Sequence, residues 1–144
     1  MKRKSTDNLQ QELMQTADLN RFLRENQENF SNINAAKTLE ELFSKRQMSK
    51  SALAKRSGMS EVYLHQLFSG RRNPSRRRTI CICIGMQASV EEAQLLLRAC
   101  GYAPLYAREQ WDAVVLYSLT HGLTLQETND ELFRHGLEPL TAGS

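Results

Sequence analysis

Apolar residues recur at intervals of three and four along most of this chain, with short polar stretches between them, which is the spacing of helices. Residues 75–84 are apolar on nearly every side beyond their basic start, so we expect a buried central helix there. One face of a later helix is marked by Trp111, Val114, Val115, Ser118 and Leu119. We expect the aromatic residues Trp111 and Tyr117 of this helix to belong to the core rather than to a ligand site. Strand-like alternation of polar and apolar residues is absent from the sequence. The pattern therefore predicts an all-α fold.

Three segments have the capping-box pattern, in which Ser or Thr precedes Glu by three residues and each side chain satisfies a backbone amide at a helix start. Thr38–Glu41 predicts a helix that runs to about residue 46. Ser89–Glu92 predicts one that ends at Gly101, and Thr124–Glu127 predicts one that ends near Gly136. These boundaries divide the chain into a unit over residues 36–101, an N-terminal helical extension (1–35) and a C-terminal extension with two helices (102–144).

Residues 49–69 predict two short helices joined by a tight turn. Ser49 and Ser60 are suited to cap the two helix starts, and Gly58 lies where the chain leaves the first helix and a positive φ is favoured. Ala54 is small enough to let the helices approach closely. The hydrophobic contacts between them should come from Leu53, Met59, Leu64 and Leu67. The second helix should expose Glu61, Val62, His65, Gln66 and Ser69.

The segment before this unit is less decisive. Residues 7–30 place a few apolar side chains in a background of Asn, Gln and Glu, which predicts one or two amphipathic helices. Two hypotheses remain open for them: they cover the outside of the main domain, or they mediate dimerisation.

The net charge of +3 is distributed unevenly. Between Lys45 and Arg78 there are ten Lys and Arg residues against a single acid, Glu61, so this region has a balance of +9 and the remainder of the chain −6. Such a concentration of positive charge suits a polyanion such as DNA. An acidic protein or a membrane surface would satisfy the same arithmetic, so charge alone does not identify the partner.

The spacing of several residues in this region is typical of one family. Leu53-Ala54, Gly58-Met59-Ser60, Leu64 and Gly70-Arg71-Arg72-Asn73-Pro74 resemble the lambda-repressor/Cro-like family, also called the xenobiotic-response-element family, over about residues 36–100. The resemblance implies a five-helix DNA-binding domain whose recognition helix, residues 60–69, lies in the major groove of double-stranded DNA. It also implies a transcriptional repressor that acts as a homodimer on an inverted-repeat operator, with half-sites about 34 Å apart.

Roles for individual residues follow from this resemblance. The residues expected to contact bases are Glu61, Val62, His65 and Gln66. Gln66 is suited to adenine, Glu61 to the amino group of cytosine and Val62 to the methyl group of thymine. The residues expected to contact phosphates are Lys50, Ser60, Tyr63, Arg71, Arg72, Asn73 and Arg76. The arginine triplet 76–78 is expected to extend that contact, or else to be an ordinary solvated helix start.

Other classes of function are less well supported by the sequence. The three histidines lack a neighbouring nucleophile or ligand spacing, so we expect neither catalysis nor a metal or cofactor. Cys81, Cys83 and Cys100 lie in apolar helical stretches and should behave as buried hydrophobic residues. The sequence has no apolar run long enough for a membrane span and no signal-peptide pattern, so we expect a cytoplasmic protein. The rival to DNA binding is a helix-turn-helix used as a protein-binding module, as in an adaptor, an antitoxin or a phage-encoded inhibitor.

Overall fold

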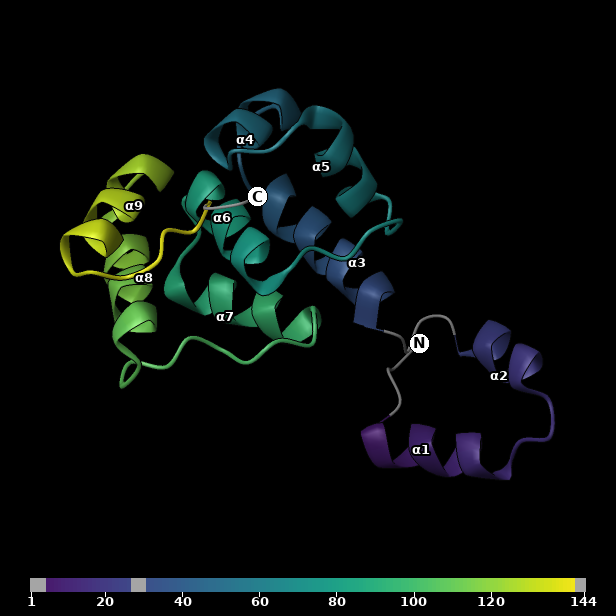
Figure 1. The fold of residues 1–144 in the computed structure, drawn as a ribbon. Coiled ribbons are helices and arrows are strands. Elements are labelled where there is room, and N and C mark those ends of the chain that lie inside the picture. Colours follow the sequence, from purple (N-terminus) through teal and green to yellow (C-terminus); the bar gives the residue numbers. More distant parts are fainter. Residues whose placement is uncertain (1–4, 27–30, 142–144) are drawn as a thin grey trace.

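A computed structural model describes residues 5–26 and 31–141, and within these ranges every regular element is a helix (Figure 1). The prediction of an all-α fold is confirmed for this part of the chain. None of the described helices combines the length and the apolar character that crossing a membrane requires. The helices are α1 (Thr6–Gln15), α2 (Leu19–Glu25), α3 (Ser31–Ser44), α4 (Lys50–Arg56), α5 (Glu61–Phe68), α6 (Arg76–Met86), α7 (Val90–Ala99), α8 (Gln110–His121) and α9 (Leu125–Arg134).

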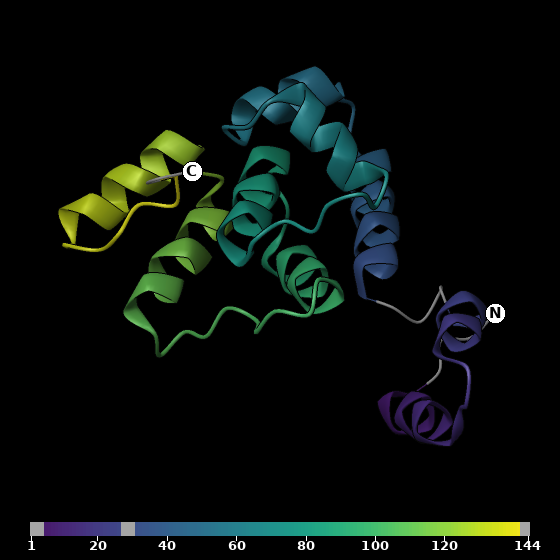
Figure 2. The same ribbon diagram turned by 45° about the vertical axis from the view of Figure 1, so that its right-hand side comes forward.

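The N-terminal extension forms two helices, α1 and α2, which turn back on each other as a hairpin. Ser5 and Asp18 cap them, and the Asn26 amide donates a hydrogen bond of 3.0 Å to the Glu12 carboxylate across the hairpin. Both views place the hairpin beyond the N-terminal end of α3, away from the remaining helices (Figures 1 and 2). It does not cover the outside of the main unit. Residues 27–30 of the predicted helical region lie outside the described residues.

The predicted start of the next helix at Thr38 is wrong. Helix α3 begins at Ser31, and Thr38 lies in its interior. The apolar face extends one turn earlier than the capping pattern suggests, because Ala35 and Leu39 are both buried and stand four residues apart. A Thr followed three residues later by Glu is compatible with a helix interior as well as with a helix start, so the local pattern was ambiguous.

Helix α6 forms the centre of the fold, as predicted. Every residue from Thr79 to Met86 is buried, with α3, α4 and α5 on one side and α8 and α9 on the other (Figure 1). The same core continues into the C-terminal region through Leu105, Val115, Leu119, Leu132 and Leu140. Residues 102–141 are thus an integral part of one packed unit, and the predicted boundary after residue 101 does not separate two cores.

The C-terminal half contains a structural repeat that the sequence analysis did not recognise. The pairs α6–α7 and α8–α9 match when the chain is shifted by 35 residues, which superposes Ser89 on Thr124. These two residues open α7 and α9 with complete capping boxes, to Glu92 and Glu127. The first helix of each pair ends in a left-handed residue, Gln87 with φ 54° and its equivalent Gly122 with φ 64°.

Each pair is closed by the same kind of clamp. After a Gly-x-x-Pro-Leu segment (101–105 and 136–140), an amide side chain from the second helix binds the backbone of the leucine. Gln94 accepts a hydrogen bond of 2.7 Å from the Leu105 amide and donates one of 2.9 Å to its carbonyl. Asn129 accepts one of 2.7 Å from the Leu140 amide and donates to the Thr141 hydroxyl at 2.9 Å. The second helix pair therefore repeats the capping box and the closing clamp of the first.

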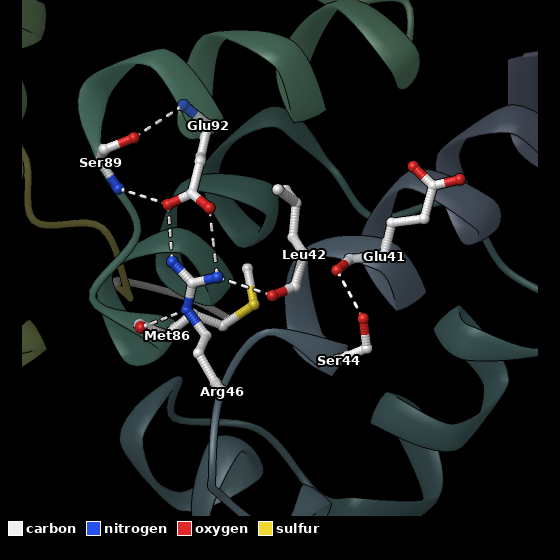
Figure 3. Close-up of polar contacts among 7 residues, drawn as sticks. All are labelled: Glu41, Leu42, Ser44, Arg46, Met86, Ser89 and Glu92. Carbon is white, nitrogen blue, oxygen red and sulfur yellow. Dashed lines mark hydrogen bonds and ion pairs between the residues drawn. The ribbon is translucent and has the colours of Figure 1, made fainter.

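An ion pair fastens the end of α3 to the start of α7 (Figure 3). The Arg46 guanidinium donates to both oxygens of Glu92, at 2.6 and 3.3 Å, and also to the carbonyls of Leu42 and Met86. The two charged side chains are only 16% and 22% exposed. Hydrogen bonds from Arg46 are the main cause that lowers the pKa of Glu92 to about 2. The pair therefore contributes stability at neutral pH.

The end of α4 comes very near α6 at Gly85. A Cβ atom at this position would lie 2.3 Å from the Ser57 hydroxyl and 3.2 Å from the Ser57 backbone nitrogen. Glycine thus lets the end of α4 rest directly on α6. This contact fixes the segment that leads from α4 into α5.

Candidate nucleic-acid interface

The predicted pair of short helices is present as α4 and α5. Ser49 caps α4 by accepting a hydrogen bond from the Ala52 amide, and Ser60 caps α5 by accepting one from the Tyr63 amide. Gly58, in the turn between them, has φ 69° as the sequence indicated. The inner sides of the two helices are fully buried in the common core. These local contacts hold α5 at a fixed angle on the surface.

The outer face of α5 carries the four residues predicted to contact bases. Val62 is 69% exposed, although it is a large apolar residue, and it lies beside exposed Glu61 and His65. Gln66 is half-buried, one turn further along the helix. The structure thus brings all four to one accessible surface.

Basic side chains border this surface on two sides. The Lys50 ammonium lies 4.5 Å from the centre of the Phe68 ring, at the far end of α5. On the other side, Arg72 and Arg78 lie against the Tyr63 ring, at 5.4 and 4.4 Å from its centre. Such contacts orient each cation while leaving its hydrogen-bond donors free for other partners.

The segment after α5 is exposed but ordered by its backbone. Arg71, Arg72 and Asn73 are all exposed, and the amides of both arginines donate to the Gln66 carbonyl, at 3.0 and 3.3 Å. These bonds fold the chain back at the end of α5. Two arginines predicted to contact phosphates are therefore held next to the predicted base-contacting face.

A cleft of about 360 Å³ opens beside the start of α5. Ser60, Tyr63, Arg72 and Arg78 line it from the α5 side. The lining also includes Leu140 and Thr141 from the C-terminal segment. The cleft combines the amide end of a helix with two guanidinium groups, so its electrostatic character favours an anion.

Arg76 requires a correction. Its guanidinium donates to the carbonyls of Ala103 and Pro104 and forms an ion pair of 3.2 Å with Asp112, which is buried. The side chain is therefore engaged by the C-terminal segment, and its donors are turned away from the predicted phosphate contacts. Sequence analysis missed this because Asp112 is remote along the chain.

Arg77 is likewise engaged by the C-terminal segment. It pairs with Glu138 at 2.5 Å, donates to the Pro139 carbonyl and lies over the Trp111 ring. Only Arg78 of the triplet faces the candidate interface, where it contacts Tyr63. The 76–78 triplet is therefore neither a uniform phosphate contact nor a simple solvated helix start.

The two aromatic residues expected in the C-terminal core differ in their environment. Trp111 is half-buried and its indole N–H donates to the Glu138 carbonyl at 2.8 Å. Tyr117 is 53% exposed and stacks on His121, so its predicted place in the core is wrong. The helical spacing did identify α8, but it did not show which of its faces lacks a covering helix.

Comparison of the chain with protein-family models, curated proteins and solved structures gave no match.

Proposed function

We propose that this protein binds double-stranded DNA through α5 as a lambda-repressor/Cro-like regulator, and that it represses transcription as a homodimer on an inverted-repeat operator. The observation that carries the proposal is the outer face of α5. Exposed Glu61, Val62 and His65 and half-buried Gln66 form a set of side chains able to distinguish base edges, bordered on both sides by cations.

The distribution of charge on this surface refines the proposed contacts. Asp112 and Glu138 compensate Arg76 and Arg77. The cations that remain beside α5 are Lys50, Arg71, Arg72 and Arg78. Four phosphate contacts per protomer correspond to a slope of about −3.6 in a plot of log K against log salt, and a dimer doubles this value. In this proposal Arg78, and not Arg76, is the arginine of the 76–78 triplet that contacts a phosphate.

Selection of bound sequences from a random pool of duplex DNA tests the central claim. We expect an inverted repeat whose half-site centres lie one helical turn, about 34 Å, apart. Failure to recover any bound duplex at low salt would refute DNA binding and leave the protein-binding module as the explanation for the exposed α5 face.

Two substitutions test the separate roles of bases and phosphates. Gln66→Ala should weaken binding to the selected operator by about 1–3 kcal/mol and relax the preference at one position. Arg71→Ala should weaken binding to all sequences and reduce the salt slope by about one per protomer. Equal effects of the two variants on operator and random DNA would contradict these roles.

Arg77→Ala provides a matched control, because Arg77 belongs to the same basic stretch but is paired with Glu138. We expect its salt slope to equal that of the wild-type protein in the same titration. A reduction as large as that of Arg71→Ala would show that overall charge, rather than the positions beside α5, determines affinity.

A further inference from the structure

A second surface of the molecule is left uncovered by the residues that the structure describes. It is a groove of about 360 Å³ on the outer side of the C-terminal helix pair. The groove is mixed in character, with apolar walls and a polar rim. Its lining comprises Gln110, Ala113, Val114 and Tyr117 from α8, and Glu131 and His135 from the end of α9.

The structural repeat shows what this groove corresponds to. Tyr117, Glu131 and His135 are equivalent to Ile82, Leu96 and Cys100 of the first helix pair. In that pair the three residues lie under α3 and α5, where they enclose a small pocket together with Ala35, Leu39 and Leu67.

The two equivalent positions differ sharply in burial. Ile82 is completely buried, whereas Tyr117 is 53% exposed. The site that α3 and α5 fill on the first helix pair is therefore open on the second. Because the two pairs share the capping box of their second helix and the clamp that follows it, we expect the open site to accept a helix with a small or aliphatic face, as the first site does.

The N-terminal hairpin carries exposed aliphatic side chains of this kind. Among the described residues nine large hydrophobic side chains are exposed, and four of them lie on α1 and α2. They are Leu13, Met14, Leu19 and Leu23. The hairpin and the α8–α9 pair occupy opposite ends of the molecule in both views (Figures 1 and 2), so a chain does not cover its own groove with its own hairpin.

We propose that the hairpin of one copy docks in the α8–α9 groove of a second copy, and that two such contacts, related by a two-fold axis, form the dimer. Leu19 and Leu23, one turn apart on α2, face Tyr117, and Arg24 meets the polar rim at Glu131, whose carboxylate also pairs with Arg134. This inference rests on the dimer in the proposed function but not on DNA binding.

Complementation between two variants of the full chain tests the arrangement. Leu23→Asp damages the hairpin and leaves the groove intact, and Tyr117→Asp does the reverse. Sedimentation should show each variant as a monomer at concentrations where the wild-type protein is dimeric. A carboxylate placed in an apolar contact should abolish that contact, so a homodimer of either variant keeps neither of its two contacts and its dissociation constant should rise more than about 100-fold. An equimolar mixture should restore a heterodimer with one intact contact.

Phe133→Asp is the matched control, because Phe133 lies on α9 and is 81% exposed but does not line the groove. Its dimer should dissociate like that of the wild-type protein, and circular dichroism should show equal helicity for all variants. A monomeric wild-type protein at about 100 µM, single variants that stay dimeric, or a mixture that stays monomeric would each overturn the arrangement. Loss of DNA binding with an intact dimer would refute the proposed function alone.

Discussion

Replacing Glu92 by glutamine removes the charge that joins the end of α3 to the start of α7. In the folded protein the Arg46 guanidinium binds both oxygens of this carboxylate, and the Ser89 amide donates to one of them at 2.9 Å. These contacts hold the pKa of Glu92 at about 2, against a usual value of 4.5. The difference corresponds to about 3 kcal/mol of folding free energy at neutral pH.

The sign of the pH dependence follows from the lowered pKa. A carboxylate whose pKa is lower in the folded state stabilises the protein above the unfolded value, and this contribution is lost as the pH falls from 4.5 towards 2. Urea unfolding followed at 222 nm should show Glu92→Gln to be about 3 kcal/mol less stable than the wild-type protein at pH 7. At pH 3 the gap should narrow to about 1 kcal/mol, because the wild-type protein has lost about 2 kcal/mol from this group.

Glu127 offers an internal control for this experiment. It makes the same capping box, with Thr124, but forms no ion pair with the residues that the structure describes. Glu127→Gln should therefore cost less than about 1 kcal/mol at pH 7. A gap for Glu92→Gln that is equal at pH 7 and pH 3, or equal to the gap for Glu127→Gln, would refute the electrostatic explanation.

Three further predictions concern packing, the clamps and the thiols. Gly85→Ala should destabilise the protein by about 1–2 kcal/mol in the same urea assay, because the cost of overpacking against α4 exceeds the gain in helix propensity. As a control, Thr120→Ala at the equivalent exposed position of α8 should change the stability by less than about 0.5 kcal/mol. Asn129→Ala should cost about 1–3 kcal/mol by leaving a buried amide without its acceptor, and Asn129→Asp, which keeps the acceptor, should retain more of the stability. Burial raises the pKa of Cys81 to about 11 and that of Cys83 to about 12, so both thiols should be unreactive at pH 8 in the folded protein. Mass spectrometry after brief exposure to a thiol reagent should find both modified only at urea concentrations that unfold the chain. Rapid labelling of the native protein would contradict this prediction.

Features set by neighbouring residues were predictable from the sequence. Ser49, Ser60, Ser89 and Thr124 each bind an amide three residues ahead, so the residues that define each cap stand together in the sequence. Gly58 marked its turn for the same reason. The all-α class and most helix positions followed from these signals and from helical spacing. The lambda-repressor-like arrangement and the DNA contacts remain predictions.

Features set by distant residues were not predictable in this way. Arg76 looked like a phosphate contact because its immediate neighbours are basic, yet its partner Asp112 is 36 residues away in sequence. The repeat had a visible signal in the Gly-x-x-Pro-Leu segments at 101–105 and 136–140, which a comparison of the chain with itself would have found. What that comparison would not show is which copy is covered, because α3 and α5 lie over only one of them.

The repeated helix pair shows how a fold can present a self-association surface. A pair that recurs in one chain presents the same kind of contact site twice, and in the first pair this site is buried inside the fold. In this chain the second pair retains the position that accommodates α3 in the first, with Leu96 and Cys100 replaced by Glu131 and His135. Polar side chains at the rim, such as Glu131 and His135, are solvated by water, so the site can stay open without exposing a large apolar surface. Repetition of a helix pair thereby provides a ready-formed receptor for a helix, in which an internal contact of the first pair has a counterpart that is open to a second molecule.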